Sequence, residues 1–257
     1  MEDIVSDEAK VVVVTGGASG IGAACVRYFL SRDWRVVINY FTDAERQSAE
    51  ALLVDRVGIV VQGDVSSDAD CRRIAQQALD AFGRIDALVS SAGTTRMVPH
   101  ADLDGLTIDD FIRTATVNTA GPFLISRACA PALAAGDGGS IVIISSYGAI
   151  YGTGSSIAYA ASKGATNTLT MSLARVLAPK VRVNAVCPAL VSDGFIERLD
   201  PELFRSRAAH QIDRSPLRKV GTPAEVAADI YWLTAGAAMI TGSVLSLDCG
   251  LHLNGDG

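Results

Sequence analysis

Residues 11–22, Val11-Val-Val-Val-Thr-Gly-Gly-Ala-Ser-Gly-Ile-Gly22, decide the fold of this chain. The four valines form a short β-branched run, which predicts a strand covered on both faces, as in a parallel sheet. The glycines that follow allow a tight turn, a close approach of the backbone to a ligand and close packing of the next helix. Free N–H groups at the start of that helix favour phosphate groups. We therefore expect this turn to bind a dinucleotide through Gly16, Ala18, Ser19, Gly20 and Ile21.

Strand-like and helix-like segments alternate along the rest of the chain. The expected strands are residues 11–14, 36–38, 59–61, 87–89, 141–144, 181–186 and 244–247. Capping-box patterns predict helices that begin after Thr42, Ser67, Thr107 and Thr222. Strands and helices that alternate without a break in composition predict one doubly wound α/β domain of the Rossmann type, with a seven-stranded parallel sheet and helices on both faces. We expect this domain to span residues 10–257, after an acidic disordered tail over residues 1–9.

Composition excludes several classes of protein. Apolar residues make up 49% of the chain and its net charge is −6, without a basic stripe, so we expect no nucleic-acid partner. No apolar run approaches the ~20 residues of a membrane helix, and the acidic N-terminus does not resemble a secretory signal. Five scattered cysteines and three isolated histidines predict reduced thiols in a cytoplasmic protein, with no metal site.

Residues 192–219 do not fit the alternation of strands and helices. This segment is rich in charged residues and follows the sixth expected strand. Ligands of doubly wound sheets bind beyond the carboxyl ends of the strands, so the segment is a candidate substrate lid. The alternative is a helical excursion on the surface without a role in binding.

A second motif lies in the second half of the chain. Tyr159 and Lys163 are four residues apart, so they share one face of a helix, where the ammonium would favour the phenolate. Ser146 follows the apolar strand 141–144 and adds a hydroxyl group. These three side chains predict a proton-transfer site, although a Tyr/Lys pair on its own is also typical of a solvated helix surface.

Two other strand ends support a nucleotide site. Asp64 and Val65 follow the third strand, where the carboxylate can accept a hydrogen bond from an adenine amino group. Ser91, Ala92 and Gly93 follow the fourth strand, and their small side chains would let a nucleotide lie close to the backbone.

The motifs occur in the order found in the short-chain dehydrogenases/reductases, and the chain resembles the group of that family with the TGxxxGxG and YxxxK motifs. The resemblance covers residues from about 10 to 253. It rests on residues 15–22, Asp64, residues 91–93, Asn118, Ser146, Tyr159, Lys163 and Pro188. It implies a Rossmann-type fold, an NAD(P)(H)-dependent reaction between a secondary alcohol and a ketone, and a homotetramer or homodimer formed through the helices that contain Asn118 and Tyr159.

The same resemblance implies a role for each residue of the motif. Tyr159 is the general acid/base, and Lys163 lowers its pKa and binds the nicotinamide ribose. Ser146 holds the substrate oxygen, a role for which the neighbouring Ser145 is the rival. Asn118 anchors a water molecule that connects Lys163 with solvent.

Further cofactor contacts are implied after the sixth strand. Pro188 and the backbone of Val191 would contact the nicotinamide, together with Tyr159 and Lys163. Asp193 stands where the family commonly has a threonine for the carboxamide, so this chain departs from the pattern there. It also departs at Ser91, where the family often has asparagine.

The end of the second strand distinguishes the two nicotinamide cofactors. NAD-preferring relatives have an aspartate there, whereas this chain has Asn39 and Tyr40, of which Tyr40 is the expected contact. No arginine or lysine stands at positions 18, 19 or 41, where NADP-preferring relatives usually have one. The missing carboxylate favours NADP(H) over NAD(H).

The substrate is expected to be a small carbonyl compound or alcohol that contacts Ser146, Tyr147, Tyr151 and Leu190. The two tyrosines are equally compatible with plain packing. Arginines in residues 192–219 suggest a thioester on an acidic carrier, as in 3-oxoacyl-carrier-protein reductases, but interleaved acidic residues favour a solvated mixed-charge surface. A non-catalytic nucleotide-binding regulatory module is the alternative function; the intact set of motif residues argues against it.

Overall fold

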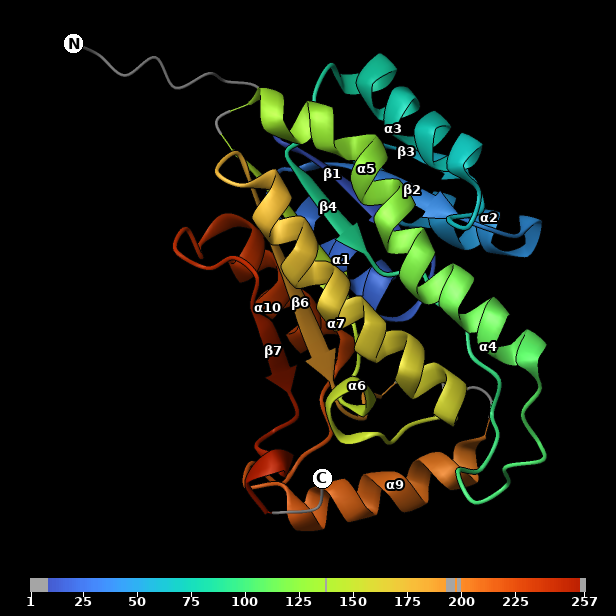
Figure 1. Cartoon of the computed structure of the whole chain (residues 1–257). Coiled ribbons are helices and arrows are strands. Elements are labelled where there is room, and N and C mark those ends of the chain that lie inside the picture. The colour runs from blue at the N-terminus through green and yellow to red at the C-terminus, as the bar shows by residue number, and fades with distance from the viewer. Residues whose placement is uncertain (1–8, 137, 193–196, 198–199, 255–257) are drawn as a thin grey trace.

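All seven expected strands form one parallel sheet, in the order β3-β2-β1-β4-β5-β6-β7 (Figure 1). The computed structural model describes residues 9–136, 138–192, 197 and 200–254. Asp193 and residues 1–8 of the expected tail lie outside these ranges. The strands are β1 Val11–Thr15, β2 Arg35–Tyr40, β3 Gly58–Gln62, β4 Ala87–Ser90, β5 Gly139–Ile144, β6 Val181–Pro188 and β7 Val244–Leu247. The predicted fold class is confirmed.

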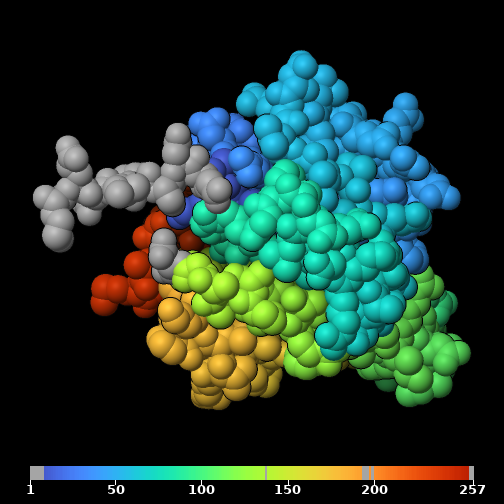
Figure 2. Space-filling view, turned by 90° about the horizontal axis from the view of Figure 1, so that it is seen from above, coloured from blue at the N-terminus to red at the C-terminus, as the bar shows by residue number. Residues whose placement is uncertain are grey.

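Helices connect the strands and cover both faces of the sheet. They are α1 Gly20–Leu30, α2 Asp43–Ala51, α3 Asp68–Phe82, α4 Ile108–Ala115, α5 Gly121–Ala135, α6 Gly148–Tyr151, α7 Ile157–Leu177, α9 Pro201–Arg214 and α10 Pro223–Ala235. A π-helical turn, Thr116–Ala120, joins α4 to α5, and a 3-10 turn, Leu251–Asn254, follows β7. Seen from above, α3, α5 and α7 lie next to one another as one layer (Figure 2).

The alternation of side chains along β1 explains why that strand is apolar throughout. Val12 and Val14 face a core shared with α1 and α10, which contains Phe29 and Ile230. Val11 and Val13 face a second core, shared with α3, α5 and α7. Both faces of the strand are therefore buried, as expected for a parallel sheet between two helical layers.

Three of the four predicted capping boxes are present. Thr42, Thr107 and Thr222 each exchange hydrogen bonds with the acidic residue three positions later. At Ser67 the prediction of a box is wrong, although its hydroxyl accepts from the N–H of Asp70. The Asp70 carboxylate accepts instead from the N–H of Asp64, at 2.9 Å, and thereby holds the loop after β3.

Helix α9 lies across the end of the sheet. The strand arrows point toward α9, which lies below the carboxyl ends of the strands (Figure 1). Gln211 on α9 is buried and its side chain accepts from the N–H of Leu190 at 3.0 Å and donates to the Lys219 carbonyl at 3.2 Å. These bonds fix α9 to the loop that follows β6. Within the described ranges, no helix has the length and apolarity needed to cross a membrane.

Candidate active site

A cleft of about 1770 Å³ runs along the carboxyl ends of the strands. The glycine-rich turn, the ends of β3 to β6, α7 and α9 all contribute to its walls. The predicted site residues on the walls are Gly16, Ser19, Gly20, Ile21, Asp64, Val65, Ser91, Ala92, Gly93, Ser146, Tyr147, Tyr159, Lys163, Pro188, Leu190 and Val191. Most of the residues predicted from separate motifs thus meet in one cleft.

The glycine-rich turn has the shape that a pyrophosphate requires. Gly16 has a φ of +60°, and a Cβ there would lie 2.9 Å from the Cα of Ala92. At Gly22 a Cβ would collide with the carbonyl of Gly16, so only glycine lets α1 begin this close to the strand. Ser19 makes no side-chain cap and the first turn contains no acidic residue, so the N–H groups at this helix start face no competing carboxylate. The turn therefore fits a dinucleotide phosphate.

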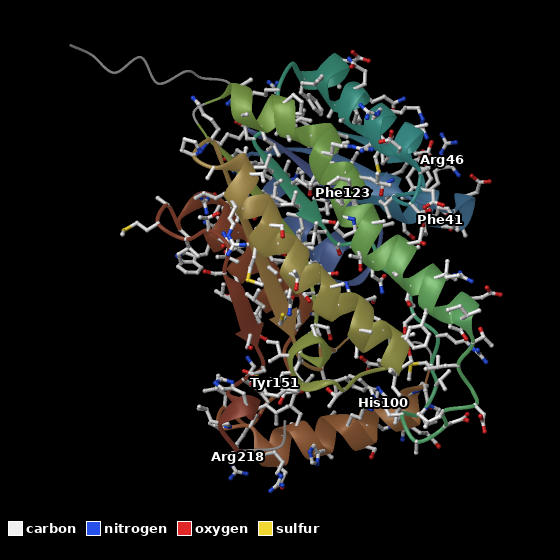
Figure 3. All side chains as sticks on the ribbon, in the orientation of Figure 1. Phe41, Arg46, His100, Phe123, Tyr151 and Arg218 are labelled. Atoms are coloured by element: carbon white, nitrogen blue, oxygen red, sulfur yellow. The ribbon has the colours of Figure 1, made fainter. Side chains whose placement is uncertain are left out.

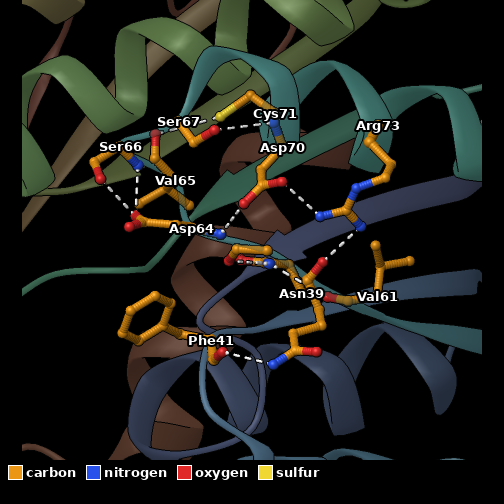
Figure 4. Close-up of polar contacts among 12 residues, drawn as sticks. Asn39, Phe41, Val61, Asp64, Val65, Ser66, Ser67, Asp70, Cys71 and Arg73 are labelled. Atoms are coloured by element: carbon orange, nitrogen blue, oxygen red, sulfur yellow. Dashed lines mark hydrogen bonds and ion pairs between the residues drawn. The ribbon is translucent and has the colours of Figure 1, made fainter.

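Asn39 links this turn to two strands, a role that the sequence alone did not reveal. Its amide is buried and donates to the carbonyls of Val61, at 3.3 Å, and Gly63, at 3.0 Å (Figure 4). Its side-chain oxygen accepts from the N–H of Gly16 at 3.4 Å. In the sequence, the one indication of this role was a polar residue at the end of an apolar strand.

The predicted contact from Tyr40 is not present on the cleft wall. Tyr40 belongs to the core that contains Val36 and Ile38, because side chains two apart on a strand share a face. Phe41 and Glu45 line the cleft instead, next to Asn39. Ala18 is likewise buried in the core, away from the wall.

Glu45 places a carboxylate near the end of β2, where positions 39 and 40 carry none. One of its oxygens accepts from the N–H groups of Phe41, at 2.9 Å, and Thr42, at 3.0 Å. These are the bonds of the capping box at the start of α2. The capping box therefore holds a negative charge on the cleft wall.

The ends of β1 and β4 are joined through a hydroxyl group. The Thr15 oxygen accepts from the N–H groups of Ser91, at 3.1 Å, and Ala92, at 3.2 Å. Its bonds to backbone groups do not depend on the side chain at position 91, where this chain departs from the family pattern.

Ser146, Tyr159 and Lys163 meet on one wall of the cleft. The Ser156 hydroxyl accepts from the N–H of Tyr159 at 3.2 Å and starts α7, which places Tyr159 in the first turn of that helix and Lys163 one turn later. The Ser146 oxygen accepts from the N–H of Gly148, at 3.1 Å, and is hydrogen-bonded to the Tyr159 phenol. The site thus joins two hydroxyl groups, with an ammonium one helical turn away.

The structure distinguishes the two adjacent serines. The Ser145 hydroxyl is buried and donates to the Lys163 carbonyl at 3.2 Å. Ser146 is the serine that bonds the phenol of Tyr159. The Ser145 hydroxyl is thus bonded to the backbone of α7, and the preference for Ser146 over Ser145 as the holder of the substrate oxygen stays a prediction.

Burial dominates the electrostatics of the Tyr/Lys pair. It lowers the pKa of Lys163 from 10.5 to about 8, and it raises the pKa of Tyr159, against which the hydrogen bond with Ser146 acts. Burial outweighs the hydrogen bond with Ser146, so the pKa of Tyr159 lies above its ordinary value in this arrangement, and the role of Lys163 in lowering it stays a prediction. The Lys163 ammonium lies 5.8 Å from the centre of the phenol ring and donates to the Ile144 carbonyl at 2.7 Å instead of to the phenol oxygen.

Asn118 lies behind the cleft wall, in the π-helical turn. Its side-chain amide donates to the Thr94 carbonyl, at 2.9 Å, and to the Ser162 hydroxyl, at 3.0 Å, while its oxygen accepts from the N–H of Thr94 at 2.8 Å. Its backbone carbonyl accepts from the Thr166 hydroxyl at 2.8 Å. The side chain thus clamps the segment after β4, while the backbone carbonyl holds the Thr166 hydroxyl on α7.

The two tyrosines expected at the substrate have different positions. Tyr147 lines the cleft, whereas Tyr151 does not. Their rings are stacked with centroids 4.3 Å apart, so Tyr151 packs on Tyr147 from outside the wall. Tyr151 therefore has the packing role that was the alternative for these two tyrosines.

Known proteins resemble this chain over almost its whole length. The family described as enoyl-(acyl carrier protein) reductase matches residues 16–252. The granaticin polyketide synthase putative ketoacyl reductase 2 of Streptomyces violaceoruber is 38% identical over 247 residues, which are 96% of this chain and 97% of that protein. The 3-oxoacyl-(acyl-carrier-protein) reductase of Thermotoga maritima is 33% identical over 251 residues, 95% of this chain and 98% of that protein.

A solved structure agrees with these matches. A putative short-chain dehydrogenase/reductase from Burkholderia xenovorans has 42% sequence identity and a TM-score of 0.88, and the comparison covers 96% of this chain and 100% of that one. The relatives thus match this chain over nearly its whole length. That match includes the sheet, the glycine-rich turn and the segments that carry Ser146, Tyr159 and Lys163. The chain belongs to the short-chain dehydrogenase/reductase family and is an oxidoreductase.

Proposed function

We propose that the protein is an NAD(P)(H)-dependent enzyme that interconverts a secondary alcohol and a ketone. The observation that carries this proposal is the meeting of Ser146, Tyr159 and Lys163 in the same cleft as the glycine-rich turn. A nicotinamide cofactor supplies or accepts the hydride when bound. The turn around Gly16 and the helix start at Ser19 would hold its pyrophosphate, and Asp64 and Val65 would flank its adenine.

The side chains of the cleft then handle the proton. In the reduction, Tyr159 gives its proton to the carbonyl oxygen of the substrate, and in the oxidation it takes the proton from the alcohol. Ser146 holds the same oxygen, because its hydroxyl accepts from Gly148 and keeps its own proton to donate. Lys163, over the ring face, stabilises the phenolate as it forms and would bind the ribose hydroxyls. Asn118 would anchor a water molecule next to Lys163 through its carbonyl.

The remaining wall residues complete the cofactor and substrate sites. Ser91, Ala92 and Gly93 would lie against the nucleotide, and Pro188 and Val191 against the nicotinamide. Tyr147 and Leu190 would contact the substrate. Part of the segment 192–219, fixed by Gln211, would act as the cover of this site.

Between the two cofactors, we propose a preference for NADP(H). The carboxylate that NAD-preferring relatives use at the end of β2 is replaced by Asn39, whose amide is buried and bonded to backbone carbonyls. Among the described residues near the end of β2, Glu45 is the one carboxylate that lines the cleft. Its negative charge limits the preference for NADP(H) over NAD(H).

The substrate is proposed to be a 3-oxoacyl thioester, or a small ketone or sugar alcohol. Support for the thioester comes from the names of the family and of the two relatives above, which concern acyl-carrier or ketoacyl substrates. The reduced thiols favour the cytoplasm as the location, since all five cysteines are unpaired.

A homo-oligomer is proposed through α5 and α7. Phe123 is 39% exposed and Val176 73% exposed on these two helices, and they border a shallow groove with Ala130, Pro131 and Leu177. Figure 3 shows Phe123 on the outer side of α5. An exposed apolar face of this kind is typical of a subunit contact.

Tyr159→Phe tests the proposed reaction. We expect the variant to lose at least about 100-fold in turnover, because it cannot transfer the proton, and to bind NADPH with nearly unchanged affinity. Turnover would be followed through NADPH absorbance with acetoacetyl thioesters and small ketones, and binding through NADPH fluorescence. A variant that retains the full rate would contradict the role of Tyr159, and cofactor binding without turnover of any substrate by the wild type would favour the regulatory module.

A further inference from the structure

Arg207 places a guanidinium group beside the proposed proton-transfer site. It projects from α9 and is half-buried in the cleft wall. Its Nη2 donates to the carbonyl of Gly154 at 3.3 Å. Gly154 packs against the ring of Tyr159, where a Cβ on the glycine would lie 3.4 Å from the tyrosine Cδ1. One residue thus separates this guanidinium from the general acid/base.

The charge of Arg207 is not neutralised within the described part of the chain. None of the described carboxylates forms an ion pair with it. Arginines that do pair with a carboxylate are Arg46, Arg72, Arg73, Arg84, Arg96 and Arg127. Among the described residues, one donor of Arg207 is used, by a neutral carbonyl, so the planar fork keeps donors for a ligand.

The charged residues among the described residues of the cleft wall are Glu45, Asp64, Arg113, Lys163 and Arg207. Glu45 and Asp64 are the carboxylates among the described wall residues, and they follow β2 and β3 at one edge of the sheet. Arg207 projects from α9, and His100 and His210 line the same wall. Figure 3 shows His100 near α9 and Phe41, which marks the other end, beside α2. The carboxylates of the described wall therefore lie at the end of the cleft away from α9, and none of them lies on α9 beside Arg207.

We infer that Arg207 binds an anionic oxygen group of the substrate, a carboxylate or a phosphate, while Ser146 and Tyr159 hold the reacting oxygen. The inference rests on the proposed function of the cleft. A guanidinium in a partly desolvated wall binds such groups through two parallel hydrogen bonds and gains more than an exposed one. Arg207 is thus a residue that determines substrate class, and the substrate is a ketone or alcohol that carries a negative charge.

Two matched pairs of ketones distinguish the two sources of the anion. Acetoacetate and its ethyl ester differ in the carboxylate, while the acetoacetyl thioesters of phosphopantetheine and of pantetheine differ in the phosphate. The readout is the ratio of kcat/KM for the anionic member to that for the neutral member. We expect the wild type to prefer the anionic member of at least one pair, and Arg207→Gln to lower that ratio by about 10- to 100-fold.

Two further variants separate charge from structure. Arg207→Lys keeps the charge but loses the fork, so it should recover part of the ratio. Arg205→Gln is the matched control, because Arg205 is exposed on the same helix and donates to the Pro201 carbonyl. It should leave the ratio at the wild-type value. Melting temperatures and NADPH binding check that the variants fold.

The inference is overturned if the wild type has no anionic preference in either pair, or if Arg207→Gln slows both members of a pair equally. Failure of the proposed function looks different, because then no ketone is turned over by the wild type. In that case calorimetry with acetoacetate still decides about Arg207: a Kd that is the same for wild type and Arg207→Gln overturns the inference, and one that is at least about tenfold weaker in the variant supports it.

Discussion

The ammonium of Lys163 donates a hydrogen bond to the carbonyl oxygen of Ile144, at 2.7 Å. Ile144 is the last residue of β5, so this bond ties the first turns of α7 to the strand that precedes Ser146. Lys163 is only 5% exposed, and no carboxylate contributes to its pKa, which burial lowers to about 8. A buried ammonium held by one neutral carbonyl costs folding free energy, and the cost has a pH dependence that can be measured.

Lys163→Met should remove a rise of stability with pH. In the unfolded chain the pKa of lysine is about 10.4. Between about pH 8 and pH 10.4 the unfolded state therefore binds more protons than the folded state. The free energy of unfolding contributed by this group therefore increases with pH across that window, and below it the cost of the buried charge is present in full. The wild type should gain about 1–2 kcal/mol relative to the variant between about pH 7.5 and pH 9.5.

Urea unfolding at the two pH values measures this difference. Lys180→Met is the control, because Lys180 is exposed at the end of the loop before β6. The unfolding free energy of Lys180→Met should change with pH as that of the wild type does. If Lys163→Met and the wild type change in parallel, the lysine is not the buried cation described above.

Asn118→Ala should destabilise the protein more than the loss of one hydrogen bond. Its side chain makes two bonds to the backbone of Thr94 and one to Ser162. Removal leaves the part-buried N–H and carbonyl of Thr94 without these partners, so we expect a loss of about 2–3 kcal/mol in unfolding free energy, together with lower turnover. Ser162→Ala removes one of these bonds and should cost about 1 kcal/mol. Equal losses in the two variants would contradict the clamp on Thr94.

The sequence predicted the layers of the fold because the pattern of its strands repeats many times. Continuous apolar runs such as that of β1, buried on both faces, have no other stable place than the middle of a parallel sheet. Residues in fixed motifs, such as Ser146 and Tyr159, were predictable for a similar reason: each sits at a strand end or in a first helical turn. The distance between them follows from the packing of α7 on β6 and the end of β5.

Details at the ends of elements were not predictable in this way. Tyr40 and Phe41 are adjacent and both aromatic, and a shift of one residue decides which faces the core and which the cleft. Glu45 was visible as a capping residue, but its place on the wall depends on how α2 leaves β2. Asn39 has three carbonyl acceptors from two strands, a set that exists only after the strands pair.

Glu45→Gln should increase the preference for NADP(H) over NAD(H). The amide keeps an oxygen for the N–H groups of Phe41 and Thr42, so the helix start is preserved while the charge is removed. A carboxylate several ångströms from a 2′-phosphate is worth about 1 kcal/mol of repulsion, which corresponds to a gain of ~5-fold for NADP(H). Fluorescence titrations with NADPH and NADH measure the ratio of the two dissociation constants.

Glu50→Gln provides the matched comparison for that prediction. Glu50 lies on the same helix, is exposed and pairs with Arg46 at 2.8 Å. We expect no change of the ratio in this variant. Added salt should reduce the effect at Glu45, because exposed charges are screened. An unchanged ratio in Glu45→Gln at low salt would show that the 2′ position is recognised elsewhere.

Val176→Glu should dissociate the proposed oligomer. Val176 is 73% exposed on α7 and lines the groove next to Phe123 on α5, so a carboxylate there would lose its hydration in the subunit contact. Size-exclusion chromatography with light scattering should show a mass of more than one chain for the wild type and a smaller mass for the variant. Met239→Glu is the control, since Met239 is 99% exposed in the segment between α10 and β7, away from this groove. If both variants keep the wild-type mass, the subunits meet through another face, and if the control alone dissociates, that face includes Met239.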